Sequence, residues 1–265
     1  MNFYHSVSSN KTVSNRLLDI FTNSVGAWSV RKVRTLYTGY CMEVYNGTSY
    51  SDISFDSNGD LDVSAIASHC GTNDGFVSKL YDQSGNSYTA SQTDSAKMPK
   101  IYDGTSQSVI FKNGKPVIEY LPNPGTGEVY ASLVLDTSLS INVTTAHFFL
   151  VTGRDSGRRG VWRNGYPGPY NRYVAQMGNS GGAGVGQNLY VNGAASAVTN
   201  KQEFAGAIGA QAVYNSKQTL NGNNQGIGSD GNGMHDTQEI IIFDSAMDDD
   251  REAIENNQNA YFNVY

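Results

Sequence analysis

Hydrophobic residues occur along this chain in short runs, and turn-forming residues separate the runs. The pattern predicts β-strands over residues 40–45, 76–81, 108–111, 116–121, 146–153, 205–214 and 238–244. Asn-Gly pairs at 58–59, 113–114 and 192–193 predict tight turns, the last of them inside a hairpin, "LYVNGAASAV". Residues 101–104 predict another turn. Many short strands with turn signals between them are typical of a β-sandwich or jelly roll.

Helical spacing is confined to three short segments. Leu17, Leu18, Phe21 and Val25 recur at helical intervals, so we expect a helix from a cap at Ser14 or Asn15 to about residue 24. Residues 27–33 fit either a continuation of that helix or a strand. A second helix is predicted over 63–68, capped by Asp60 or Asp62. A closing helix is predicted over 248–261, with Ala253, Ile254 and Tyr261 on its inner face.

Length and composition favour one large all-β domain. The 265 residues suffice for a sizeable core, and we expect a polar N-terminal arm over 1–14 followed by a sandwich domain over 15–265. Charged residues make up only 16% and the formal net charge is −6, which argues against a nucleic-acid binder. The N-terminus shows no signal-peptide pattern and no apolar run could span a membrane. We therefore expect synthesis in a cytoplasm and no membrane insertion.

The metal-ligating residue types are scattered. Cys41 and Cys70 are predicted to be separate buried thiols, and the four histidines show no zinc-site spacing, so we expect no cofactor and no transition-metal site. Acidic and amide residues alternate in "FDSNGDLD", residues 55–62. The glycine of this stretch is misplaced for an EF-hand, so we interpret it as a hairpin with a helix cap and keep a bound Ca²⁺ as the alternative.

Several motifs resemble a known enzyme family. "TLYTGYCMEV", "FVSKLYDQSGNSYTASQ" and "NGKPVIEY", in that order, resemble the catalytic domain of fungal-type α-L-arabinofuranosidases. "GIGSDG" and the segment from "TQEIIIFD" to "NAYF" are similar to the last strand and closing helix of concanavalin A-like, laminin-G-like sandwiches. The "LLD…AWSVRKVRT" segment is similar to one in bacteriophage virion proteins. The resemblance covers residues 17 to 262 and implies an all-β, concanavalin A-like jelly-roll β-sandwich.

The same resemblance implies a catalytic pair that this chain holds only in part. Asp230, in "GIGSD", matches the general acid of the family. The family's nucleophile is a glutamate that precedes the "LYVNG" hairpin, but residues 156–202 contain no Asp or Glu, and the nearest matching positions are 176–178. Because glycoside hydrolysis depends on two carboxylates, we predict no enzymatic activity. An active enzyme would need a second carboxylate, for example Asp236 or Glu239.

Two segments carry candidates for binding rather than catalysis. In "YDQSGN", Asp82 and Gln83 fit either a sugar contact or an Asx-type turn, and we favour the turn. The segment 157–178 combines cationic and aromatic side chains, which suit a glycan, a subunit interface or an exposed loop. Its candidate residues, with Asp82, Gln83 and Asp230, are Arg159, Trp162, Arg163, Tyr166, Tyr170, Arg172 and Tyr173.

From these observations we predict a non-enzymatic structural protein of a bacteriophage virion, such as a capsid decoration, tail or fibre component. Its predicted partners are other virion proteins, further copies of itself in a homo-oligomer, and a glycan on the host surface. No nucleic acid and no membrane are expected as partners. The alternative is a glycoside hydrolase of the α-L-arabinofuranosidase type.

Overall fold

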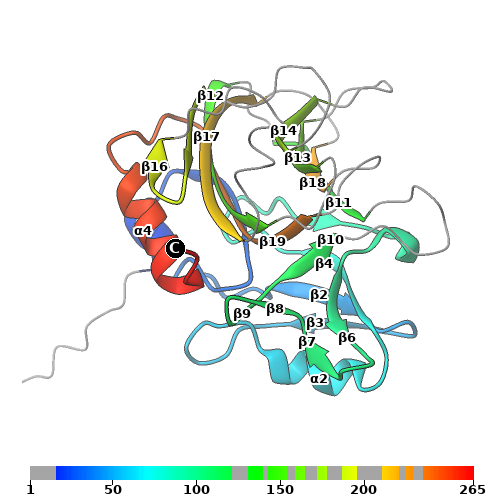
Figure 1. Cartoon of the computed structure of the whole chain (residues 1–265). Coiled ribbons are helices and arrows are strands. Elements are labelled where there is room, and N and C mark those ends of the chain that lie inside the picture. The colour runs from blue at the N-terminus through cyan, green and yellow to red at the C-terminus, as the bar shows by residue number, and fades with distance from the viewer. Residues whose placement is uncertain are drawn as a thin grey trace, which may run out of the picture.

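The computed structural model describes residues 16–120, 131–139, 143–153, 159–164, 172–177, 187–195, 211–220, 225–228 and 235–265 (Figure 1). The predicted arm over 1–14 therefore lies outside the described residues. The helices are α1 (Leu17–Ile20), α2 (Val63–Cys70), the 3₁₀ turn η1 (Ser95–Lys97) and α4 (Arg251–Phe262). None of these helices is long and apolar enough to span a membrane.

The strands in the first half of the chain are short. They are β1 (Ser24–Ser29), β2 (Met42–Tyr45), β3 (Tyr50–Ile53), β4 (Gly75–Leu80), β5 (Ala90–Ser91), β6 (Lys100–Asp103), β7 (Ser108–Val109), β8 (Phe111–Lys112), β9 (Lys115–Pro116) and β10 (Ile118–Tyr120). The later strands are β11 (Ser132–Leu135), β12 (Val143–Gly153), β13 (Arg159–Asn164), β14 (Arg172–Met177), β15 (Gln187–Val191), β16 (Ala194–Ala195), β17 (Ala212–Leu220), β18 (Gly226–Gly228) and β19 (His235–Phe243).

Two runs of antiparallel strands form the sandwich. In the first run β19 lies between β1 and β12, and β12 continues through β17 to β15. The second run contains β11, β18, β13 and β14 and is joined through β5 and β4 to β2 and β3. The two runs are continuous, because β10 pairs with both β19 and β6. This architecture confirms the predicted all-β, concanavalin A-like sandwich.

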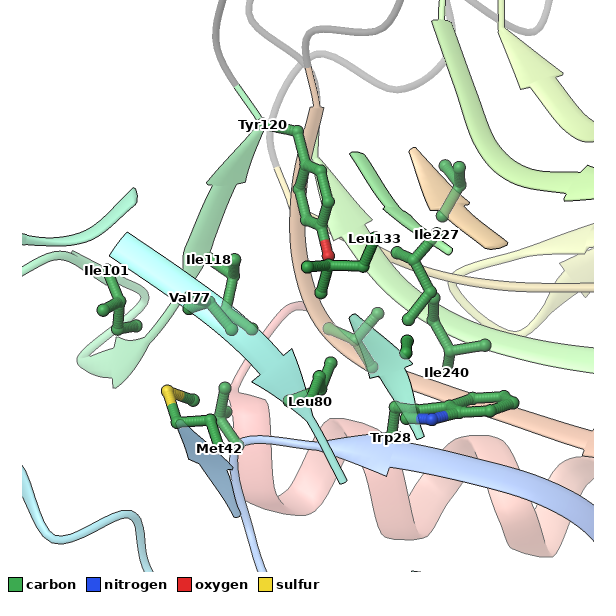
Figure 2. Close-up of a cluster of buried hydrophobic side chains, with 14 of the residues drawn as sticks. Trp28, Met42, Val77, Leu80, Ile101, Ile118, Tyr120, Leu133, Ile227 and Ile240 are labelled. Carbon is green, nitrogen blue, oxygen red and sulfur yellow. The ribbon is translucent and has the colours of Figure 1, made fainter. Parts of the chain in front are cut away.

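The main hydrophobic core lies between the two runs. Trp162 of β13 contacts Trp28 of β1 and Phe148 of β12, with ring centroids 5.3 and 5.8 Å apart. Figure 2 shows Ile118, Leu133 and other aliphatic side chains of this core, all buried. Full burial of such side chains contributes about 1.5–3 kcal/mol each, so this layer is the main source of stability.

The outer face of the first run is covered by the two terminal helices. Leu17 and Leu18 of α1 and Ile254 of α4 pack with Phe149 and Ile241, which point away from the main core. The structure thus confirms the predicted closing helix. It differs in one detail, since Ala253 is exposed rather than on the inner face.

The first predicted helix is much shorter than its spacing suggested. Helix α1 ends at Ile20, and the chain is already in β1 at Ser24, opposite Phe243 of β19. Pairing along β19 outweighs the weak helical preference of this segment, and residues 24–29 are therefore strand. Two further boundaries were wrong: residues 100–103 form β6 rather than a turn, and the strand predicted over 205–214 is β17, Ala212–Leu220, set by pairing with β12.

The structure confirms several turns, a helix cap and the state of the two cysteines. The hairpin at Asn192–Gly193 joins β15 to β16, and Asn113–Gly114 joins β8 to β9. The Asp62 side chain accepts a hydrogen bond from Ala65 N and caps α2. Cys41 and Cys70 are free and buried, as predicted.

Two glycines of the "GIG" motif are required by the packing of β18. A Cβ on Gly226 would lie 2.3 Å from the carbonyl oxygen of Leu133 in β11. A Cβ on Gly228 would lie 2.8 Å from both the carbonyl oxygen of Ala131 and the Tyr120 ring, and its φ is +82°. The motif therefore allows β18 to lie close to β11.

Replacing Gly228 with alanine should lower the free energy of unfolding by about 2–4 kcal/mol, because the methyl group meets backbone and the positive φ is strained. Gly47→Ala is the matched control: its φ is +89°, but no atom lies within 4 Å of the added Cβ. That control should cost about 1 kcal/mol. Equal losses in urea denaturation of the two variants would contradict the packing argument.

A buried polar network attaches α4 to the sheet. His147 of β12 accepts a hydrogen bond from Met247 N at Nδ1, and its Nε2 lies 3.0 Å from Asn215 Oδ1. The Asn215 amide in turn donates to Glu255, which also binds Arg251. Burial lowers the pKa of His147 below its usual 6.5, although Asn215 opposes this effect. Burial likewise raises the pKa of Glu255.

Stability should therefore fall as the pH drops below about 6.5, because the unfolded chain then binds a proton at His147 that the folded chain resists. His147→Gln should remove this part of the pH dependence between pH 7.5 and 5.5. Glu255 changes stability in the opposite direction, but it is common to both proteins. An unchanged profile in His147→Gln would overturn the assignment.

Candidate functional site

Asp82 and Gln83 hold together a corner between β4 and β1. The Asp82 carboxylate accepts hydrogen bonds from the backbone N–H groups of Ala27, Ser84 and Tyr88 and from the Ser84 hydroxyl. The fully buried Gln83 amide accepts from Val33 N and donates to the carbonyls of Ser29 and Arg31. Every one of these contacts is internal to the protein, and both side chains are buried.

One candidate residue of the aromatic and cationic segment 157–178 lies in the core. Trp162, one of its predicted contact residues, is fully buried against Trp28 and Phe148, so it belongs to the core and not to a glycan or subunit contact. Of the other candidates, Arg159 and Arg163 lie on β13 and Arg172 and Tyr173 on β14, whereas Tyr166 and Tyr170 lie outside the described residues.

Glu239, one of the two proposed second carboxylates, has a structural role. It is fully buried on β19 and accepts hydrogen bonds from the Ser29 hydroxyl at 2.7 Å, from Arg31 Nε and Nη2 at 2.8 and 3.0 Å, and from Gln258 at 3.2 Å. Gln258 belongs to α4, so the helix covers this carboxylate. The Arg31 side chain is buried in this bidentate ion pair.

Asp236, the other proposed carboxylate, lies near the beginning of the same strand. The pairing of β12 with β19 shifts register between Val151–Glu239 and Thr152–Thr237, so Gln238 is an extra residue on β19. The extra residue reverses the alternation, so the side chains before Gln238 lie on the face opposite to the one that a regular strand would give them. Bulges are frequent next to active sites. Thr237 lies opposite Ile118 of the core, and Asp236 lies on the opposite face, across from Gly153.

A second carboxylate lies directly opposite Asp236. Glu119 of β10 is its cross-strand partner, and Lys100 of β6 is in turn the cross-strand partner of Glu119. Cross-strand partners share a face with Cβ atoms about 4.5–5.5 Å apart. Lys112 Nζ, from the β8–β9 hairpin, lies 3.5 Å from Asp236 Oδ2. The sheet therefore presents two adjacent carboxylates flanked by two lysines.

The sequence analysis did not predict Glu119 as a candidate site residue, although it identified the motif "NGKPVIEY", which contains this residue. The available signal was the alternation in Ile118-Glu119-Tyr120. Both apolar neighbours are buried in the core, which places the carboxylate on the opposite face of β10.

An amide without a partner lies beside this pair. The Gln211 side chain lies over Gly153, since a Cβ on that glycine would be 2.7 Å from Gln211 Oε1. Gln211 is only 6% exposed, yet neither of its amide atoms has a hydrogen-bond partner among the described residues. Leaving a buried polar group unpaired costs about 1–3 kcal/mol, so this amide is suited to bind a ligand hydroxyl. Because Gly153 has no side chain, Gln211 can lie against the backbone of β12 at the residue that pairs with Asp236.

Asp230 lies outside the described residues. The sequence places it two residues after the end of β18 and five before the start of β19. The Asp56 loop is a hairpin in which the Asp56 carboxylate accepts hydrogen bonds from Asn58 N and Asp60 N. Within the described part of the chain no group of three or more His, Cys, Asp or Glu side chains could hold a metal ion.

The fold is similar to that of three solved arabinofuranosidase structures. One is an arabinofuranosidase complexed with arabinofuranosyl-α-1,2-xylobiose, with 14% sequence identity and a TM-score of 0.51. Another is a GH54 α-L-arabinofuranosidase soaked with a cyclic sulfate inhibitor, with 15% identity and a TM-score of 0.50. Each match covers 88% of this chain but only 62% of the matched chain. No family model and no curated protein matches the sequence.

These comparisons correct the prediction of a protein without enzymatic activity, because every solved structure matched is a glycoside hydrolase. That prediction rested on the absence of Asp and Glu from residues 156–202. The structure shows a different source for a carboxylate pair, on β10 and β19 rather than in that stretch. At these identities the similarity establishes the fold alone.

Replacing Glu239 with glutamine should lower the free energy of unfolding by about 3 kcal/mol, since it leaves the buried Arg31 guanidinium without its counter-charge. Glu43→Gln is the matched control, because the Glu43–Lys79 pair, at 2.9 Å, is partly exposed. Its loss should cost less than about 1 kcal/mol. Chemical denaturation of both variants measures the difference, and a Glu239→Gln protein of unchanged stability would refute the structural role.

Proposed function

We propose that this chain is a glycoside hydrolase domain of the α-L-arabinofuranosidase type. The observation that supports it most is the cross-strand pair of Glu119 and Asp236, on a fold similar to arabinofuranosidases over 88% of the chain. Retaining glycosidases hold their two carboxyl groups about 5–5.5 Å apart, whereas inverting enzymes need about 6.5–9.5 Å. Directly opposed residues in an antiparallel pair suit the shorter distance.

The environments of the two carboxylates suggest different roles. Asp236 is the more buried of the two and lies 3.5 Å from the Lys112 ammonium, which holds its carboxylate in place, so we assign it as the nucleophile at the anomeric carbon. Glu119 is more exposed and lines an open cleft, so it donates a proton to the departing glycosidic oxygen. The resulting glycosyl ester at Asp236 is hydrolysed by a water whose proton passes to Glu119. Gln211 can bind a sugar hydroxyl beside the reacting carbon.

Incubation with 4-nitrophenyl α-L-arabinofuranoside tests the proposal. The wild-type chain should release 4-nitrophenol, and proton NMR of the first sugar product should show retained anomeric configuration. Asp236→Asn should lower kcat/KM by about 10³-fold or more. Glu119→Gln should lower it by about 10²–10⁴-fold on a natural glycoside, and less on the aryl substrate, whose leaving group needs little protonation.

Asp94→Asn is the control, since this carboxylate is half exposed and caps the η1 turn. Asp230→Asn tests the acid that the resemblance implied: a larger loss there than in Glu119→Gln would assign the proton donor to Asp230. Inverted product would reject Asp236 as nucleophile. A folded wild-type chain that releases no sugar from aryl or polymeric arabinofuranosides would reject the proposed function.

The predicted location on a bacteriophage particle, with other virion proteins and further copies of the chain as partners, stays a prediction. It rests on the "LLD…AWSVRKVRT" resemblance alone. An enzyme carried on a particle could hydrolyse a surface polysaccharide of the host, so that location is compatible with the proposed activity.

A further inference from the structure

Asparagine is followed by glycine at four places that lie wholly within the described residues. An asparagine side chain can react with the backbone nitrogen of the next residue to form a succinimide ring, and a following glycine offers no side chain to hinder the approach. The reaction needs a side-chain amide that is free to turn and a backbone N–H without a hydrogen-bond partner. The four pairs are Asn46–Gly47, Asn58–Gly59, Asn113–Gly114 and Asn192–Gly193.

Hydrogen bonds hold the side chains of two of these asparagines. Asn46 Oδ1 accepts from the backbone N–H groups two and three residues later, at 3.0 and 2.9 Å, and Asn46 Nδ2 donates to His69 O at 2.9 Å. Asn192 Oδ1 accepts from Val213 N, on β17, at 3.0 Å. Neither amide can turn toward the following glycine without breaking these bonds.

In the third pair the attacking nitrogen itself is bonded. Gly59 N donates to Asp56 O at 3.0 Å, and Gly59 is buried. The Arg16 guanidinium covers this glycine and donates to Asn58 O at 2.9 Å. The nitrogen is therefore neither free nor accessible.

Asn113 and Gly114 form the tip of the β8–β9 hairpin (Figure 1), and both are exposed. Among the described residues no hydrogen bond involves the Asn113 side chain or the Gly114 N–H. No atom lies within 4 Å of a Cβ placed on Gly114, so the space beside its nitrogen is open. Ring closure requires the left-handed turn, with φ of +50° and +73°, to relax. Only a few ladder bonds oppose this, because β8 and β9 have two residues each.

Two ammonium groups flank the same tip. Lys112 and Lys115 are cross-strand partners, directly before and after the pair. The attacking species is the deprotonated amide of Gly114, and a negative charge then develops on the side-chain oxygen of Asn113. Nearby positive charges favour both of these anionic forms.

We propose that Asn113 is a deamidation site. Gly114 N, after losing its proton to solvent, bonds to Asn113 Cγ, and the side-chain nitrogen leaves as ammonia with a proton taken from water. A water molecule then opens the succinimide at either of its carbonyl carbons. Opening at one carbonyl gives aspartate, and opening at the other gives isoaspartate, in which the backbone runs through the former side chain.

The product places a new carboxylate next to Lys112, whose Nζ lies 3.5 Å from Asp236 Oδ2. This carboxylate competes with Asp236 for the ammonium group. Isoaspartate also lengthens a turn whose geometry depends on its length, which moves Lys112 further. Deamidation would therefore lower the activity of the carboxylate pair as the protein ages. This consequence, unlike the modification itself, rests on the proposed function.

Mass spectrometry of proteolytic fragments tests the modification. The full folded chain is incubated in mildly alkaline buffer, and conversion of amide to acid is followed at each of the four asparagines. Asn113 should convert about fivefold or more faster than the other three, since each of those must first break a hydrogen bond. Asn113→Gln, which closes no succinimide ring, should abolish the signal in that fragment.

The same chain unfolded in urea is the control. There the four asparagines should convert at similar rates, which would assign the difference to the fold. Conversion at Asn46, Asn58 or Asn192 as fast as at Asn113 in the folded chain would overturn the proposal. So would the same order of rates in urea.

Kinetics with 4-nitrophenyl α-L-arabinofuranoside test the consequence. Asn113→Asp should lower kcat/KM by about two- to fivefold at low salt, as expected for competition at an exposed ion pair, and less at high salt. Asn113→Gln should match the wild type, and Asn113→Asp should have no further effect in a Lys112→Met background. An active chain in which Asn113→Asp equals the wild type would overturn the effect on the carboxylate pair. Preferential conversion at Asn113 in a chain without hydrolytic activity would keep the modification site and reject only the proposed function.

Discussion

The extra residue at Gln238 determines which face of the sheet carries the carboxylates of the central strand, β19. β19 pairs with β1, β10 and β12, and all nine of its residues are buried. Because side chains alternate along a strand, an odd separation would normally place Asp236 and Glu239 on opposite faces. The bulge removes that alternation at one point. Both carboxylates consequently lie on the outer face of the sheet, Glu239 beneath α4 and Asp236 beyond it, opposite Glu119.

Glu239 and Asp236 lie on the same strand, but their surroundings differ, and so do the roles that they suit. Glu239 is surrounded by donors that satisfy both of its oxygens, and it has no access to solvent. A buried ion pair of this kind contributes little net stability compared with an apolar pair, but it is costly to break. Asp236 instead has a lysine at 3.5 Å, a glycine opposite it and an unpartnered amide beyond that glycine. Asp236 is buried as well, at 6% exposure, but its neighbours on the outer face differ from the bidentate arginine that holds Glu239.

Local signals in the sequence predicted the elements that depend on local interactions. The Asn-Gly turns, the Asp62 cap, the long apolar strand that became β12 and the closing helix all follow from short-range preferences. The errors have a common cause in long-range pairing. Ser24 is in a strand because it pairs with Phe243 of β19, and the strand predicted to end at residue 214 continues to Leu220 because it pairs with β12. A register shift at Gln238 depends on pairing with β12 and leaves no signal in "TQEIIIFD" itself. The pairing of Glu119 with Asp236 therefore could not be derived from the sequence.

Glu119 and Asp236 are held by two strands that are hydrogen-bonded to each other, which fixes the separation of the two carboxylates. Residues 156–202 carry no acid, so a catalytic pair built there would have been impossible, whereas β10 and β19 are hydrogen-bonded to each other directly. Groups held on paired strands keep their separation better than groups held on loops, and covalent catalysis at an anomeric carbon tolerates little error in that separation. The same rigidity gives the pair a fixed position relative to the β8 hairpin, because Gln238 donates to the carbonyl oxygens of Lys112, Lys115 and Pro116. The bulge residue thus attaches the hairpin that carries Lys112 to the strand that carries Asp236.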